Sequence, residues 1–151
     1  MKTAHRILAI TALLLIGLTL AARADDASND VANARSSGNL KQIGLGLMMY
    51  AADNNNKLPD LSNAQNLQKA LACYLKDEKV FVHPPSGEPY LTNPTLSGQE
   101  LKTVKVPSDT VVVYEPNPAA DGTRAVLFVD AHVERLTKRR WLQFKKISNI
   151  P

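Results

Sequence analysis

The sequence contains few of the residues from which disulfide-bonded folds and thiol-based active sites are built. Among 151 residues there is one cysteine, Cys73, and aromatic residues make up only 5%. A single cysteine excludes an internal disulfide framework. Its neighbours are apolar, which predicts that Cys73 is a buried small side chain, with an intermolecular disulfide as the alternative.

The usual hydrolase and zinc motifs are also missing. The chain has no Gly-x-Ser-x-Gly nucleophile elbow. His83 and His132 lie far apart and lack the paired spacing of a zinc site. A Cys73–histidine pair would need its nucleophile on a buried helix face. We therefore predict a protein that is not an enzyme and holds no cofactor.

Calcium is the one metal for which oxygen ligands are available. Asp121 and Asp130 are weak candidates in the C-terminal half, and residues 53–60 are rich in Asp and Asn. The loop at residues 53–60 lacks the glycine and glutamate of an EF-hand. The favoured interpretation of all these side chains is turn formation.

The first residues have the order of an export signal. Lys2 and Arg6 precede an apolar run at residues 7–22, and Ala22 and Ala24 supply small residues for cleavage. The sequence thus predicts a signal peptide at residues 1–24, one mature domain at residues 25–151 and a periplasmic or secreted location. The run is short for a membrane span; a retained N-terminal anchor is the alternative.

Cleavage would change the charge of the protein. The full chain carries 18 basic and 14 acidic residues, a net charge of +4. The signal contains Lys2, Arg6 and Arg23 and no acid, so the mature chain has a net charge of +1. A nearly neutral domain gives no general electrostatic reason to bind nucleic acid.

A long amphipathic helix is the clearest predicted element. Asn29 or Asp30 can cap its start, and the Asp/Asn run at residues 53–56 can end it. Gly38, Gly44 and Gly46 weaken helicity but let a partner approach closely. The apolar positions recur at steps of three and four and form one stripe: Val31, Ala34, Leu40, Ile43, Leu47, Tyr50 and Ala51.

Shorter elements fill the rest of the chain. Asn63 can cap a second helix at residues 64–75, and residues 141–147 predict a final turn of helix with Trp141, Leu142 and Phe144 docked inward. Strand-like patterns occur at residues 80–82, 90–91, 101–106, 110–114, 125–129 and 132–136. The prediction is an α+β fold: a long N-terminal helix packed on a small antiparallel sheet, plus a short second helix.

Several segments resemble pseudopilin-like proteins with a C-terminal H-X9-DG motif, relatives of type IV pilins and type II secretion pseudopilins. Residues 39–44, followed by 49–51, 53–54 and 58–59, are similar to the family's signature on the helix and its exit. Residues 74–76, 79–81, 106–110, 115 and 125–133 are similar to its later segments, although His83-Pro84 stands where the family usually has Cys-Pro. The resemblance implies a pilin-like head and an accessory role in a pilus or type II secretion-like envelope assembly.

The chain departs from that family at named positions. Ala120 stands where the motif has histidine, and Ala131 where it has glycine, so only Asp130 of the motif remains. A signal peptide replaces the prepilin leader. The resemblance therefore implies a pilin-like fold without the usual route into a filament.

Two surfaces are candidates for contacts. Leu45, Met48 and Met49 widen the helix stripe and predict a protein–protein contact with an envelope, pilus or secretion component. The alternative function is a free periplasmic or secreted module that binds an acidic ligand through its basic C-terminus. The residues of that second surface are Arg135, Lys138, Arg139 and Arg140.

Overall fold

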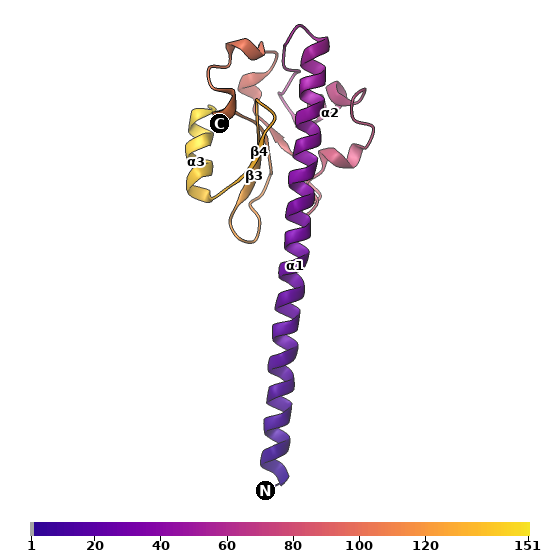
Figure 1. Cartoon of the computed structure of the whole chain (residues 1–151), viewed down its shortest axis with the longest axis vertical. Helices are drawn as coiled ribbons and strands as arrows, with labels where there is room; N and C mark the ends of the chain where they lie inside the picture. The colour runs from indigo at the N-terminus through magenta and orange to yellow at the C-terminus, as the bar shows by residue number, and fades with distance from the viewer. Residues whose placement is uncertain (1) are drawn as a thin grey trace.

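The computed structural model describes the backbone of residues 2–151 and the side chains of residues 27–151. The chain forms the predicted α+β fold (Figure 1), with three α-helices and a four-stranded antiparallel sheet. The helices are α1 (Lys2–Asp53), α2 (Ala64–Leu71) and α3 (Lys138–Ile147). The predicted signal peptide, residues 1–24, lies outside the described side chains.

The sheet follows the order of the chain. Its strands are β1 (Leu91–Thr92), β2 (Val111–Tyr114), β3 (Arg124–Phe128) and β4 (Val133–Leu136), and each pairs with the next. The register shifts by one residue between Val111 and Val113, which marks a β-bulge in β2. The predicted meander of strands near residues 110–114, 125–129 and 132–136 is confirmed, and β1 adds a short edge.

Helix α1 covers one face of this sheet. Leu40, Ile43, Leu47 and Ala51 are buried, and α1 contacts β3. A Cβ built on Gly44 would lie 2.8 Å from Cδ1 of Leu127 and 3.3 Å from Cβ of Ala131, so any other residue at this position would require the Leu127 side chain to shift. The close approach predicted for the helix glycines is confirmed at Gly44 and at Gly46, where an added Cβ would lie 3.0 Å from Cδ1 of Leu75. It is wrong at Gly38, where nothing lies within 4 Å of an added Cβ.

Helix α3 covers the opposite face. Because side chains alternate along a strand, successive β3 residues enter different cores. Ala125 and Leu127 belong to the core with α1, whereas Val126 and Phe128 pack with Phe144 of α3. The sheet thus lies between α1 and α3 (Figure 1), and both faces of β3 are buried as the run of apolar residues predicts.

The predicted ends of the helices are partly confirmed. Helix α1 ends at Asp53, and Asn55 and Asn56 adopt positive φ in the exit loop. Asn63 caps α2 by accepting a hydrogen bond from the Asn66 N–H at 2.9 Å. The predicted cap at Asn29 or Asp30 is wrong, because α1 runs through both residues.

Other predictions about α1 and the residues around Cys73 are also wrong. Val31 is 62% exposed and Ala34 is exposed, because no described part of the chain covers that end of the stripe. Helix α2 stops at Leu71 instead of residue 75. Cys73 consequently lies in a turn and is exposed instead of buried.

Three further predictions need correction. Residues Glu78–Phe81 form a 3-10 turn, so only Val82 of the predicted strand makes a bridge, to Pro89. The predicted strand at residues 101–106 does not form, and Leu101–Thr103 is another 3-10 turn instead. Leu142 is 56% exposed instead of docked, although Phe144 is buried and Trp141 half-buried.

Candidate functional site

A buried ionic cluster lies between α1 and the sheet. Glu115, just after β2, is fully inaccessible. Its Oε1 accepts a hydrogen bond from Ser36 Oγ of α1 at 2.6 Å, and its Oε2 accepts one from the Ala125 N–H at 2.7 Å. Arg135 of β4 completes an ion pair, with Nη2 2.8 Å from Oε1. Four segments of the chain therefore meet at one carboxyl group.

Tyr90 and His83 extend the cluster. The buried Tyr90 hydroxyl lies 2.9 Å from Ser36 Oγ, and burial raises the pKa of Tyr90 to about 12. His83 is 3% exposed, and its Nε2 lies 3.6 Å from Glu115 Oε1 while its Nδ1 lies 2.9 Å from Ser86 Oγ. These groups satisfy one another away from solvent and link α1, through Ser36, to the sheet and to the segment before β1.

His83 is expected to make the stability of the fold dependent on pH. Burial lowers its pKa from the ordinary 6.5; the Glu115 carboxylate opposes this shift and Arg135 reinforces it, with smaller effects from Glu88 and Arg124. Below pH 6.5 the unfolded chain therefore binds more protons at this residue than the folded chain does. The free energy of unfolding should fall as the pH drops from 7 towards 5, by at most about 1.4 kcal/mol per pH unit.

Urea denaturation at pH 7 and pH 5 measures this loss. His83→Gln should remove most of the difference between the free energies of unfolding at pH 7 and pH 5. His132→Gln is the matched control, since His132 is exposed and, among residues 27–151, forms its ion pair with Asp130 and stacks on Phe128 without contacting Glu115. It should leave the pH dependence of the free energy of unfolding in place. An equal dependence in His83→Gln and the unmodified protein would contradict the assignment to His83.

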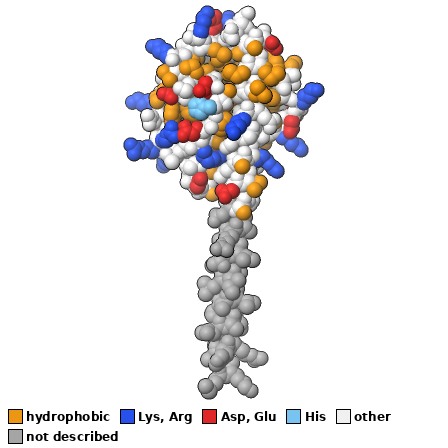
Figure 2. All heavy atoms as spheres, viewed as in Figure 1, with side chains coloured by type: hydrophobic (Ala, Val, Ile, Leu, Met, Phe, Trp, Pro, Cys, Tyr) orange, Lys and Arg blue, Asp and Glu red, His pale blue; other side chains and the backbone are white. Residues whose placement is uncertain are grey.

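The predicted contact residues on α1 are mostly at the surface. Leu45 is 60% exposed and Met49 is 44% exposed, whereas Met48 is half-buried and packs against the core. Figure 2 shows apolar side chains gathered over the upper part of the head, at the end where α1 terminates, with Lys and Arg spread around its periphery.

The predicted basic surface is only partly available. Lys138, Arg139 and Arg140 are exposed on α3, but Arg140 forms an ion pair with Glu134. Arg135 does not belong to that surface, because it is half-buried against Glu115. Within the described part of the chain, Lys138 and Arg139 form no ion pair.

The calcium candidates do not converge. Asp121 accepts hydrogen bonds from the N–H and hydroxyl of Thr123, and Asp130 accepts one from the N–H of His132. Among residues 27–151, no three His, Cys, Asp or Glu side chains lie close enough together to hold a metal ion. The two aspartates form turn hydrogen bonds here.

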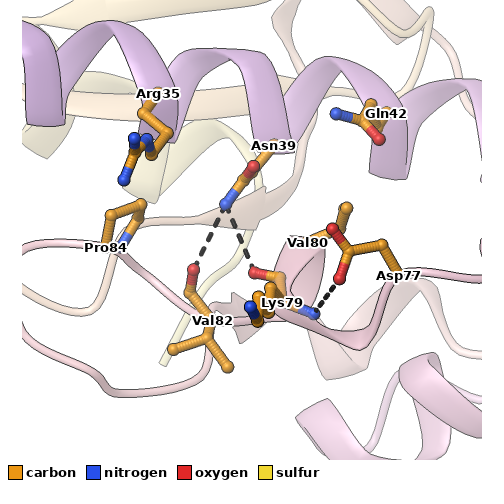
Figure 3. Close-up of a pocket in the computed structure, with 8 residues that line it drawn as sticks. All are labelled: Arg35, Asn39, Gln42, Asp77, Lys79, Val80, Val82 and Pro84. Atoms are coloured by element: carbon orange, nitrogen blue, oxygen red, sulfur yellow. Dashed lines mark hydrogen bonds between the residues drawn. The ribbon is translucent and has the colours of Figure 1, made fainter.

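A groove runs between α1 and the segment before β1 (Figure 3). Its volume is about 530 Å³. Arg35, Asn39 and Gln42 of α1 face Lys79 and Val82 across it. The Asn39 amide donates to the carbonyl oxygens of Val82 at 3.3 Å and of Lys79 at 3.5 Å, which fixes one wall to the other.

The sequence predicted neither the cluster nor the groove. One signal for the cluster was present: Ser36 falls in phase with Leu40, Ile43 and Leu47, so a polar side chain stands on the buried face of the helix. The groove had no comparable signal, because its two walls are about 40 residues apart in the sequence.

Comparison of the chain with protein-family models, curated proteins and solved structures found no match. Within residues 27–151, no helix has the length and apolar character needed to span a bilayer.

Proposed function

We propose that this chain is an exported, non-enzymatic, pilin-like protein that acts through protein–protein contacts, as an accessory of a pilus or type II secretion-like envelope assembly. The observation that carries the proposal is the uncovered side of α1. Val31, Leu45 and Met49 are 62%, 60% and 44% exposed. Val31 and Leu45 are 14 residues apart and Leu45 and Met49 four, spacings that keep all three on one side of a helix.

Two further observations support a pilin-like arrangement. The long N-terminal helix lies along a small antiparallel sheet, as the resemblance implies. Ala131 has a φ of 70°, a conformation that glycine adopts readily, and this is the position where the resembled family has glycine. The residue that departs from the motif thus adopts a backbone conformation that glycine would also allow.

Replacing Leu45 and Met49 with lysine together should abolish the contact. Burying two added ammonium groups in an apolar interface is unfavourable, so the fraction that co-sediments with envelope assemblies should fall about tenfold or more. The matched control is Leu142→Lys with Ile147→Lys, which adds the same charge at two exposed apolar residues of α3. Unmodified protein that stays entirely in the supernatant would contradict the proposal.

The acidic-ligand module remains the second candidate. Its support is the composition of α3, which contains five basic residues and no acidic one. It is weaker than the sequence alone suggested, because the ion pairs of Arg135 and Arg140 leave only Lys138 and Arg139 of the four predicted cations uncommitted within the described residues.

A further inference from the structure

The groove in Figure 3 lies on the same side of α1 as the exposed apolar residues. At about 100° per residue, Met49 is rotated about 40° and Leu45 about 80° from Arg35 around the helix axis. Arg35, Asn39 and Gln42 form one wall of the groove, at steps of four and three residues. A molecule resting on Leu45 and Met49 would therefore have this wall within reach.

The groove offers hydrogen-bond donors that the described part of the chain does not use. Arg35, Gln42 and Lys79 are exposed, and among residues 27–151 their side chains form no hydrogen bond or ion pair. In contrast, the Asn39 amide is engaged with two carbonyl groups. The cationic groups of Arg35 and Lys79 and the amide of Gln42 thus border the same groove.

The remaining lining gives the groove a mixed character. Val82 is 38% exposed and Pro84 adds apolar surface, whereas Val80 lines the groove but is buried. The one acid on the lining, Asp77, already accepts a hydrogen bond from the Lys79 backbone N–H at 3.0 Å as the cap of the 3-10 turn. An occupant must therefore combine apolar contact area with negative charge.

We infer that this groove and the adjacent face of α1 bind an acidic amphipathic segment of an envelope protein, whose carboxylates meet Arg35 and Lys79 while its apolar side chains cover Leu45 and Met49. This inference rests on the proposed function and adds the chemistry of the partner. The positive charges of Arg35 and Lys79 favour an acidic segment over a basic one. A carboxylate of that segment can accept directional hydrogen bonds from the Arg35 guanidinium beside the apolar surface.

The test begins with the exported protein in its native envelope and a water-soluble carbodiimide, which joins a lysine amine to a carboxylate in direct contact. Peptide mapping should find Lys79 linked to an Asp or Glu of another protein. Lys79→Arg keeps the positive charge but removes the amine. This variant should therefore still co-sediment with the envelope but should no longer form the cross-link. A link from Lys79 only to a second copy of this chain would overturn the inference.

Charge reversal supplies the matching affinity test. Arg35→Glu with Lys79→Glu should lower the co-sedimenting fraction about tenfold or more. Lys138→Glu with Arg139→Glu makes the same change in net charge on α3 and should have no effect. An equal fall in both variants would overturn the inference in favour of a general polyanion contact. Both substituted pairs are exposed, so unchanged thermal unfolding is expected.

The variants also separate this inference from the proposed function. If Arg35→Glu with Lys79→Glu co-sediments like the unmodified protein while Leu45→Lys with Met49→Lys does not, the acidic partner is wrong and the α1 contact stands. If neither pair changes co-sedimentation, both are wrong.

Discussion

Arg135→Met is expected to lower the free energy of unfolding by about 3–5 kcal/mol, because it leaves a buried carboxylate without its cation. Glu115 is fully inaccessible, and its Oε1 lies 2.8 Å from Nη2 of Arg135. Ser36 Oγ and the Ala125 N–H would remain as donors, but neither carries a charge. Urea denaturation at pH 7 measures the difference.

Two controls make this prediction specific. Arg139→Met changes an exposed arginine in the same way and should stay within about 0.5 kcal/mol of the unmodified protein. Glu115→Gln combined with Arg135→Met removes both charges and should recover part of the loss. A loss below 1 kcal/mol for Arg135→Met alone would show that the ion pair does not hold α1 to the sheet.

Leu47→Ala should cost about 2–5 kcal/mol, since it removes a large apolar side chain from the core between α1 and the sheet. Leu47 is 1% exposed, whereas Leu45, two residues earlier on the same helix, is 60% exposed. The matched change Leu45→Ala should therefore alter the free energy of unfolding by less than about 0.5 kcal/mol. Thermal or urea unfolding of the two variants gives the comparison, and equal effects would contradict the packing of α1.

The core of the fold could be predicted from local patterns in the sequence. Leu40, Ile43 and Leu47 recur at helical steps, and each is buried against the sheet. The runs at residues 110–114 and 125–129 are apolar at successive positions, which predicts burial on both faces. In the structure α1 covers one face of these strands and α3 covers the other. For these elements the local spacing of apolar residues predicts which side chains are buried, so the sequence is sufficient to identify them.

Elements whose structure depends on distant neighbours could not be predicted in this way. Residues 101–106 alternate like a strand, but the edges of β2 are already occupied by β1 and β3. The chain there bonds to the exit of α1 instead, with the Leu101 N–H donating to the Asn56 carbonyl oxygen at 2.8 Å. Val31 fits the helix stripe equally well, yet no described segment reaches it.

The misassignment of Arg135 has a similar cause. In sequence it precedes Lys138, Arg139 and Arg140, and the run as a whole suggests one basic surface. Strand alternation separates them: Arg135 pairs with Ala125 and so lies on the α1 side of β4. Its counter-ion, Glu115, is 20 residues earlier, and no local pattern relates the two.

The docking of α1 with one buried and one exposed side is tested most directly by thiol labelling. In a Cys73→Ser background, which removes the exposed native thiol, single cysteines at positions 43, 45, 47 and 49 are allowed to react with a soluble maleimide. Cysteines at 45 and 49 should label as rapidly as Cys73 does in the unmodified protein. Cysteines at 43 and 47 should react at least about 100-fold more slowly, because their labelling requires local opening of the fold. Rapid labelling at all four positions would contradict the account.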